Sequence, residues 1–472
     1  MKKINNNLLF FRFKRWPKYW KVVLTNIVGD RLILSEKDFS NILENKITTS
    51  LKNKLIKYGF RRNKETIKKL INAYRNKHKY LFRWPTLHII VVTKWCNLNC
   101  IYCHSKATGL NIEKYHLKKE IAEKYLKIIF SSPSPYLTIE FQWWEPTLAR
   151  EIIEFIVKKT KEYITKTNKK ISFLMTTNGY DLSDSQIKFM LENNFKINIS
   201  IDWPEELHNK NRPAFPAQPS FEKIVKNIKK IKSFERQFWK KLITWWIAVI
   251  TEYSLDYYNE IPQIYKNLEI NHILTKYIDW LWRSQENKQI QYTIEEFIKF
   301  YENYLKKIKE INLEGFKLVD WYTNLFVQKI IWKTNPNFVD LQNPCWAAIW
   351  QVAYNRDGNI YTCDEWRTIE NDLFKLWDRQ NINSIKDIVQ NENTAIMCNC
   401  SLLESNICDR CIYQPYCGIC PVHNYINFWE LFVDIRKTPR HKFNQFIQDF
   451  IFEQIITKNK QWLNIFNNWL KK

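Results

Sequence analysis

The sequence predicts an α/β protein in which parallel strands alternate with helices. Six apolar runs of strand length lie between residues 87 and 278, and four helical segments with an apolar stripe separate the first five runs. This alternation implies parallel βαβ units, arranged in a barrel or an open sheet. Such folds place their active sites at the carboxyl ends of the strands.

The elements of this series follow from the spacing of apolar residues. The expected strands are residues 87–93, 136–142, 171–177, 196–202, 242–251 and 272–278. The expected helices between them are residues 118–132, 149–164, 183–194 and 220–234.

Other segments flank this series. Two strand-like pieces and Lys- and Asn-rich amphipathic helices occupy the first 80 residues, and eight of the eleven cysteines fall between residues 345 and 420. We therefore divide the chain into an N-terminal α+β domain (1–82), a βα domain (83–284), a helical connector (285–340), a Cys-rich domain (341–435) and a C-terminal helix (436–472).

Charge and hydropathy narrow the class of protein. The 472 residues are 45% hydrophobic and 26% charged, as in globular chains. The net charge is +25, but Lys recurs throughout the chain and forms no single basic block. The N-terminus has only four consecutive apolar residues, too few for a signal peptide, and no run approaches a membrane span. We expect a cytoplasmic protein with no membrane or nucleic-acid partner, whose cysteines serve as ligands rather than disulfides.

Glycine and tryptophan occur in unusual proportions. Glycine appears 7 times and tryptophan 21 times, whereas an average glycine usage of about 7% would give roughly 33 glycines. Several tryptophans stand where turns usually need glycine. We expect that many of these tryptophans are encoded by UGA codons, which some bacterial lineages read as glycine and others as tryptophan. The alternative is a truly Trp-rich protein. The positions concerned include Trp143, Trp144, Trp203, Trp346, Trp350 and Trp366.

Three cysteines follow the first expected strand. Cys96, Cys100 and Cys103 have CxxxCxxC spacing on one short loop. Three thiolates spaced in this way can each bind one iron of a [4Fe–4S] cube and leave the fourth iron open. A structural zinc site would need a fourth nearby ligand. His104 is available, but adjacent residues rarely fit one tetrahedron. The loop is therefore predicted to hold an iron–sulfur cluster.

This loop, at the end of the first strand of a βα series, resembles the radical S-adenosylmethionine (radical SAM) superfamily. The resemblance implies a partial (β/α)6 barrel and a cube bound by Cys96, Cys100 and Cys103. It implies S-adenosyl-L-methionine on the open iron, and a reductant such as flavodoxin or ferredoxin. Reductive cleavage of the cofactor would give a 5′-deoxyadenosyl radical that abstracts hydrogen.

Later strand ends carry further parts of the resemblance. The family has a Gly-Gly-Glu-Pro motif after its second strand, where this chain has "WWEP", and "TNG" after its third strand, as here. After the fourth strand, "SIDWPEELHNKNR" resembles the family's "SIDGP…H…R". Each polar residue alone could equally cap a helix or form a turn. The resemblance implies a polar role near the substrate for Asp202, and cofactor binding by Trp143, Trp144, Glu145, Pro146, Asn178, Ser200 and Arg212.

The C-terminal cysteines form a second pattern. Cys345 and Cys363 flank Gly358, and "CDRCIYQPYCGIC" supplies four more cysteines. Paired CxxC units also suit structural zinc, but zinc leaves the pattern around Gly358 unexplained. The pattern resembles the SPASM domain of radical SAM maturases, which holds two auxiliary [4Fe–4S] clusters.

The resemblance assigns two ligand groups. Cys345, Cys363 and Cys420 would serve the first auxiliary cluster, and Cys408, Cys411 and Cys417 the second. Relatives usually have three residues between the last two cysteines of "CDRCIYQPYCGIC" and one further cysteine downstream, whereas here two residues separate them and no cysteine follows. Candidates for the missing ligand are Cys398, Cys400 and His441; otherwise one iron stays open to substrate.

Within the superfamily, segments from "LHIIVVTKWCN" to "YCGICPVHNY" resemble the His-Xaa-Ser system radical SAM maturase. The resemblance implies modification of a ribosomally synthesised precursor peptide (a RiPP), with a second maturase of the same system as a further partner. In the N-terminal domain, residues 21–28 and 31–35 are candidate edge strands for this peptide; the alternative is a cap on the barrel. Other open classes are a sulfatase-type formylglycine maturase, a nucleic-acid-modifying radical SAM enzyme and a non-catalytic metal scaffold.

Overall fold

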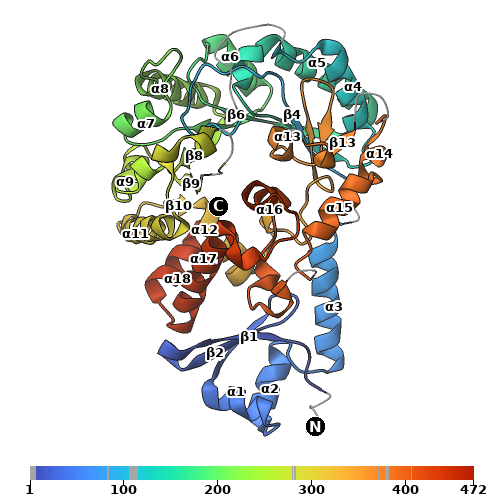
Figure 1. Cartoon of the computed structure of the whole chain (residues 1–472), viewed down its shortest axis with the longest axis vertical. Helices are drawn as coiled ribbons and strands as arrows, with labels where there is room; N and C mark the ends of the chain where they lie inside the picture. The colour runs from blue at the N-terminus through green and yellow to red at the C-terminus, as the bar shows by residue number, and fades with distance from the viewer. Residues whose placement is uncertain are drawn as a thin grey trace.

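A ten-stranded sheet organises the protein in a computed structural model that describes residues 7–81, 84–105, 115–278, 280, 283–369, 371–377, 382–404 and 407–471. The strand order is β10-β9-β8-β7-β6-β5-β4-β11-β12-β13. All neighbours from β10 to β11 pair in parallel. In Figure 1 the sheet curves around the centre of the molecule, and helices cover its outer side.

All six expected strands are present, and consecutive strands pair in chain order. They are β4 (Leu87–Ile90), β5 (Tyr136–Phe141), β6 (Lys170–Thr177), β7 (Lys196–Ser200), β8 (Ile243–Val249) and β9 (His272–Lys276). The outer helices are α4 (Lys119–Phe130), α5 (Arg150–Thr167), α6 (Asp184–Glu192), α7 (Glu205–Asn211), α8 (Phe221–Phe238) and α9 (Glu260–Asn267). The predicted α/β architecture of parallel βα units is confirmed.

The connector and the Cys-rich region both extend this sheet, which the sequence analysis did not anticipate. Helix α10 (Arg283–Glu286) spans the expected start of the connector, which then contains α11 (Ile294–Leu313), the short strand β10 (Val319–Asp320) and α12 (Trp321–Val327). The Cys-rich region contains β11 (Gln351–Tyr354), β12 (Ile360–Tyr361), α13 (Trp366–Ile369), β13 (Lys375–Trp377), α14 (Ile385–Val389), α15 (Glu392–Cys400) and α16 (Pro421–Phe428). Because β11 pairs in parallel with β4, the Cys-rich region lies beside the strand that precedes the first cysteine loop.

The N-terminal domain has its own small core. It consists of β1 (Arg12–Trp16), β2 (Lys21–Thr25), β3 (Arg31–Ser35), α1 (Glu36–Leu43), α2 (Thr49–Lys57) and α3 (Lys64–His78). Leu24, Leu34, Phe39 and Leu55 pack together in that core. The antiparallel order β1-β2-β3 makes β2 the central strand. The expectation that residues 21–28 form an edge strand is therefore wrong, whereas residues 31–35 do form one.

The C-terminal segment contains two helices instead of the single expected helix. They are α17 (Pro439–Ile456) and α18 (Lys460–Leu470). The chain turns between them because Lys458 adopts a left-handed conformation with φ 54°, and the Asn459 side chain then accepts a hydrogen bond from the amide of Trp462 at 3.4 Å. An asparagine at this position is a favoured start for a new helix.

Among the described residues, five tryptophans have backbone conformations that favour glycine. Trp143 and Trp144 have φ of 76° and 52°. Trp20, Trp239 and Trp429 each directly follow a helix, with φ of 54°, 52° and 56°. These three side chains are 77%, 94% and 70% exposed, so burial does not compensate for the conformation. A left-handed side-chain-bearing residue costs about 1–2 kcal/mol, which explains why glycine usually ends a helix in this way.

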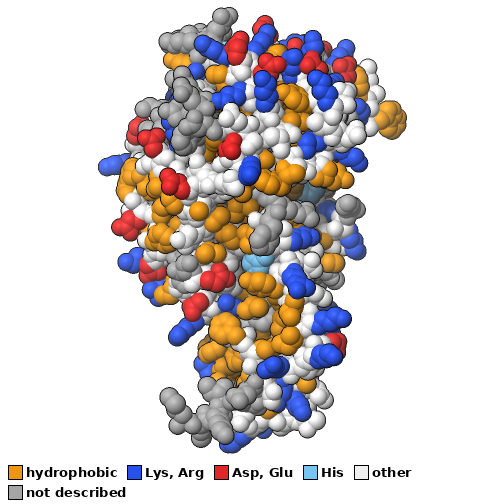
Figure 2. Space-filling view, turned by 90° about the vertical axis from the view of Figure 1, so that its right-hand side faces the viewer, with side chains coloured by type: hydrophobic (Ala, Val, Ile, Leu, Met, Phe, Trp, Pro, Cys, Tyr) orange, Lys and Arg blue, Asp and Glu red, His pale blue; other side chains and the backbone are white. Residues whose placement is uncertain are grey.

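Basic side chains are spread over the molecule. Figure 2 shows Lys and Arg scattered across a whole face among hydrophobic and acidic side chains, with no single basic block. On this face, as along the sequence, the basic residues form no single block. Among the described residues, no helix is long and apolar enough to span a membrane.

Candidate active site

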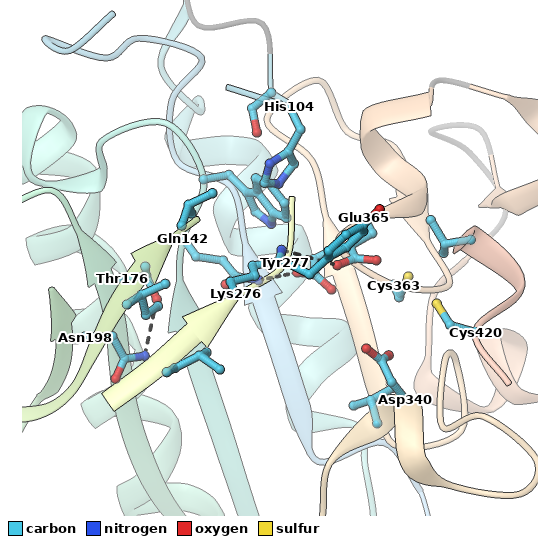
Figure 3. A pocket seen from close by; sticks show the side chains of 18 of the residues that line it. His104, Gln142, Thr176, Asn198, Lys276, Tyr277, Asp340, Cys363, Glu365 and Cys420 are labelled. Atoms are coloured by element: carbon cyan, nitrogen blue, oxygen red, sulfur yellow. Dashed lines mark hydrogen bonds and ion pairs between the residues drawn. The ribbon is translucent and has the colours of Figure 1, made fainter. Parts of the chain in front are cut away.

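A cavity of about 600 Å³ lies between the barrel and the Cys-rich region. Gln142, Thr176 and Asn198 line it from the ends of barrel strands, and Cys363 and Cys420 line it from the Cys-rich region. Figure 3 shows these two sets of side chains on opposite walls. The position is the one expected for an active site, at the carboxyl ends of parallel strands.

The first cysteine loop opens into this cavity. Cys96, Cys100 and Cys103 all line it, and the Leu98 amide donates a hydrogen bond to the Cys96 sulfur at 3.4 Å. Burial raises the pKa of Cys96, and it raises the pKa of Cys100 to about 12. Thiols in such surroundings ionise readily only beside a strong positive charge, as a bound metal supplies. The loop therefore fits an iron–sulfur cluster.

A single metal ion fits the described residues less well. No group of three or more described His, Cys, Asp or Glu side chains is arranged to hold one metal ion. The thiols of a cube do not need that arrangement, because each one binds a different iron. The imidazole of His104, the fourth candidate zinc ligand, packs edge-on against the indole of Trp143 with ring centroids 4.8 Å apart.

The two adjacent tryptophans stand beside this loop. Trp143 and Trp144 line the cavity, and their buried indole N–H groups have no hydrogen-bond partner among the described residues. The guanidinium of Arg367, from the Cys-rich region, lies 4.9 Å and 4.6 Å from their ring centroids. The indoles thus occupy space between the first cysteine loop and the opposite wall.

Glu145, which follows β5, forms hydrogen bonds with residues at the end of β6. Its carboxylate accepts hydrogen bonds from the Thr147 amide (3.2 Å) and hydroxyl (2.6 Å), from the Thr177 hydroxyl (2.7 Å) and from the Asn178 amide (2.7 Å). Burial raises the pKa of Glu145, and these hydrogen bonds oppose the shift. Glu145 and Pro146 are not among the described residues that line the cavity, so their cofactor role stays a prediction.

The remaining predicted cofactor residues reach the cavity. Asn178, Ser200 and Arg212 line it. The Arg212 side chain donates to Asp202 at 3.2 Å, and the Tyr102 hydroxyl donates to the same carboxylate oxygen at 2.8 Å. Asp202 is 1% exposed and is not among the described lining residues. Asp202 thus lies behind Arg212 and orients its guanidinium, and its role near the substrate stays a prediction.

Four cysteines of the C-terminal region share one buried cluster. Cys345, Cys363, Cys400 and Cys420 pack there together with Met397, and three of them, all except Cys400, line the cavity. The Cys345 amide donates to the Ser401 hydroxyl at 2.9 Å, which links Cys345 to the end of α15. Burial raises the pKa of Cys400 to about 12. The structure thus places Cys400 with the first predicted group.

Two cysteines of the second predicted group pack together, and the Cys411 amide donates to the Cys408 carbonyl at 3.0 Å. Cys408 and Cys417 pack with Leu403, Ile419 and Ile435. Burial raises the pKa of Cys408, and the neighbouring Cys417 and Cys411 raise it further. The other candidates for the missing ligand, Cys398 and His441, belong to neither of these described buried clusters.

Carboxyl groups in the cavity were not identified from the sequence. Glu140, Asp364 and Glu365 line it. Gln142 donates to the carboxylate of Asp364 at 2.8 Å, and Gln351 donates to its other oxygen. Burial raises the pKa of Glu140 to about 8 and also raises the pKa of Asp364. A sequence signal existed, since Asp364 and Glu365 directly follow a predicted cluster ligand.

Comparison with known proteins agrees with this site. Residues 90–237 match the family model of the Radical SAM superfamily. A cysteine-type anaerobic sulfatase-maturating enzyme of Clostridium perfringens is 24% identical over 316 residues, which cover 65% of this chain and 80% of that protein. A serine-type anaerobic sulfatase-maturating enzyme of Bacteroides thetaiotaomicron is 31% identical over 179 residues, covering 36% of this chain and 41% of that protein.

Solved structures share the fold. Native anSMEcpe with bound AdoMet superposes with a TM-score of 0.68 at 20% identity, covering 81% of this chain and 99% of that chain. Streptococcus suis SuiB bound to precursor peptide SuiA gives a TM-score of 0.53 at 16% identity, covering 93% of this chain and 98% of that chain. Residues 90–237 are therefore similar to the Radical SAM superfamily, and the chain shares the fold of these solved structures. The cofactors of that superfamily are a [4Fe–4S] cluster and S-adenosylmethionine, which the cavity and its cysteine loop fit.

Proposed function

We propose that this chain is a radical SAM enzyme that modifies a ribosomally synthesised peptide of the His-Xaa-Ser type. The observation that carries the proposal is the shared cavity, walled by Cys96, Cys100 and Cys103 on one side and by Cys363 and Cys420 on the other. Its volume of about 600 Å³ lies within the range of roughly 300–1,000 Å³ that is usual for small-molecule sites.

The barrel wall would hold the cofactors. Cys96, Cys100 and Cys103 would bind the cube, and Asn178, Ser200 and Arg212 face the space where S-adenosylmethionine would bind. When bound, these cofactors supply a 5′-deoxyadenosyl radical that abstracts hydrogen. Arg212 is already held in place by Asp202 and Tyr102, so its charge is oriented before a carboxylate arrives.

The Cys-rich wall would hold two auxiliary clusters. We assign Cys345, Cys363, Cys400 and Cys420 to the first, because these four thiols share one buried cluster. We assign Cys408, Cys411 and Cys417 to the second, with one iron left for another ligand. The auxiliary clusters would accept the electron left after hydrogen abstraction or bind the peptide.

Asp364 is the proposed acceptor of the proton that the peptide radical releases when its electron passes to an auxiliary cluster. It follows Cys363 in the chain, lines the cavity and is oriented by Gln142. Burial raises its pKa, which brings a carboxyl group closer to the range useful for proton transfer near neutral pH.

We also propose that many tryptophan positions carry glycine in the host, through UGA codons. Supporting this, Trp143 and Trp144 have positive φ and buried indole N–H groups without a described partner. The rings of Trp366 and Phe374 stack with centroids 2.9 Å apart, whereas aromatic pairs prefer about 4.5–7 Å. We include Trp203, Trp346 and Trp350 in this set. Reading the gene tests the proposal: UGA at codons 143 and 144 supports it, and UGG refutes it.

The N-terminal domain would bind the precursor peptide. Its β3 is an edge strand that an extended peptide can join. SuiB bound to precursor peptide SuiA aligns with 93% of this chain, compared with 81% for anSMEcpe. Further proposed partners are a reductant such as flavodoxin or ferredoxin and a second maturase, and the proposed location is the cytoplasm.

A second candidate function is sulfatase maturation, which the similarity to sulfatase-maturating enzymes favours. Anaerobic co-expression of the protein with each of two peptide partners, followed by mass spectrometry of the peptide, would distinguish the two functions. One partner would be a short His-Xaa-Ser-rich peptide encoded beside the gene, and the other a sulfatase peptide with its target cysteine. Total RNA would serve as a further substrate, and Cys100→Ala as the inactive control. We expect a mass change only in the first peptide, whereas a change only in the sulfatase peptide or RNA would overturn the proposal.

A further inference from the structure

The N-terminal domain packs directly on the loop that carries Cys408, Cys411 and Cys417. The Thr25 hydroxyl donates to the Ile412 carbonyl at 2.8 Å, and the Tyr416 hydroxyl donates to the Gly29 carbonyl at 2.8 Å; both bonds are buried. A Cβ atom on Gly29 would lie 2.9 Å from the Tyr416 ring. Figure 1 shows the N-terminal sheet lying against the C-terminal part of the chain.

Strand β1 directs two cations toward this loop. Arg12 and Lys14 are two residues apart, so their side chains leave the same face of the strand. Arg12 is 5% exposed and donates to the carbonyl of Asp409, which lies between two of the cysteines, at 2.6 Å. Lys14 donates to the Tyr413 hydroxyl at 2.9 Å and pairs with Asp449.

The charges of these cations act on the cysteines. Burial lowers the pKa of Arg12, and the negative charges of Glu404, Cys411, Asp409 and Cys408 oppose the shift. The partners of the two cations, Asp409 and Tyr413, stand two residues before and two residues after Cys411 in the chain. A buried guanidinium needs nearby negative charge.

The far side of the same group meets cations from other elements. Burial raises the pKa of Cys417, and Lys329 and Arg440 are among the groups that oppose this rise. Lys329 comes from the connector and Arg440 from α17. Burial lowers the pKa of Lys329 to about 7, so this side chain carries only part of a charge near neutral pH. The N-terminal domain supplies Arg12 and Lys14, which contact the loop directly through Asp409 and Tyr413.

We propose that β1 of the N-terminal domain completes the second cysteine site, with Arg12 and Lys14 as positioning residues that offset the negative charge of a cluster held by Cys408, Cys411 and Cys417. The inference rests on the proposed iron–sulfur function of this group. Reduction potentials of such clusters depend on nearby charge, hydrogen bonding and solvent exposure. The N-terminal domain therefore sets the potential of this cluster, and a change in how the domain sits changes that potential.

Redox titration of the holoprotein, followed by electron paramagnetic resonance, tests the inference. The signal of the second site is identified as the one lost in Cys411→Ser. Arg12→Gln and Lys14→Gln should each move the midpoint of that signal to a more negative value, because removing a positive charge makes reduction harder. Arg12→Lys should stay close to the wild-type midpoint. The signals of the other clusters should not move.

Arg15→Gln is the matched control. Arg15 belongs to the same strand but pairs with Glu36 within the N-terminal domain at 3.3 Å, and its side chain is 48% exposed. Equal midpoints in Arg12→Gln, Lys14→Gln and wild type would overturn the inference, as would an equal shift in Arg15→Gln. If Arg12→Gln prevents folding, Lys14→Gln decides alone.

Iron content distinguishes the remaining outcomes. Loss of about one cube of iron in Arg12→Gln, with the other signals intact, would support the inference, because the site would then need the cation to assemble. If Cys411→Ser removes no iron and no signal, the proposed iron–sulfur function of this group fails, and the inference fails with it. If Cys411→Ser does remove iron and a signal, but the midpoint of that signal is the same in Arg12→Gln, Lys14→Gln and wild type, only the inference is overturned.

Discussion

The two cysteine regions that face the cavity are built in different ways. Cys96, Cys100 and Cys103 lie on one loop after β4, so strand position and spacing alone bring them together. The opposite group combines Cys345, Cys363, Cys400 and Cys420 from separate segments, and only tertiary packing unites them. The first region is therefore a local motif, whereas the second depends on how the Cys-rich region docks through the β4–β11 pairing. Substitutions in the two regions should have separable effects.

The largest difference in activity is expected between the Cys100→Ala and Cys400→Ala variants. Loss of Cys100 removes a ligand of the cube that activates the cofactor, so deoxyadenosine formation should vanish. Loss of Cys400 affects only the first auxiliary site, so deoxyadenosine formation without peptide should persist while peptide modification falls. Chromatography of deoxyadenosine and mass spectrometry of the peptide measure the two activities. Persistent deoxyadenosine in Cys100→Ala would contradict the assignment of the barrel loop.

Asp364→Asn should lower peptide modification without affecting cofactor cleavage. The variant keeps the size of the side chain but removes the proposed proton acceptor, so peptide modification should fall about 100-fold. Deoxyadenosine formation without peptide should stay near the wild-type level. Because burial raises the pKa of Asp364, wild-type peptide modification should rise as pH increases and the carboxyl group loses its proton. Asp364→Asn should lack this rise, and an unchanged pH profile would assign the proton transfer to another group.

The sequence predicted the local part of this site, whereas the tertiary part was predicted only in part, through the resemblance that grouped Cys345, Cys363 and Cys420. The six strands and the first cysteine loop follow from apolar periodicity and ligand spacing, which are properties of short segments. Asp364 and the grouping of Cys400 depend on packing between distant segments. The contacts of Asp202 with Arg212, Tyr102 and the Val249 amide could not be predicted either, because they join elements that meet only in the fold.

Replacing both Trp143 and Trp144 with glycine should strengthen cofactor binding. Overpacked side chains cost about 1–3 kcal/mol each, and about 1.4 kcal/mol corresponds to a tenfold change in affinity. We expect at least about a tenfold lower Kd for S-adenosylmethionine in the double variant, measured by anaerobic calorimetry on the cluster-loaded protein. Trp245→Gly, on the neighbouring wall of the cavity, is the control and should not strengthen binding. An unchanged or weaker affinity in the double variant would argue for genuine tryptophans.

A smaller effect is expected far from both cysteine regions. Trp239→Gly should increase the free energy of unfolding by about 1 kcal/mol, because glycine adopts the left-handed conformation without the cost that a side chain carries. Trp332→Gly is the comparison, since Trp332 is 45% exposed and is not among the described residues with positive φ. That substitution should decrease the free energy of unfolding. Chemical denaturation measures both, and a decrease in Trp239→Gly would remove this support for recoding.

The most direct test of the account is a count of iron, acid-labile sulfide and zinc in anaerobically purified protein. We expect iron and sulfide in equal amounts in the wild type, with a loss of about four of each in Cys100→Ala and a separate loss of similar size in Cys400→Ala. Zinc without labile sulfide in the wild-type protein would contradict the claim that both walls of the cavity hold iron–sulfur clusters.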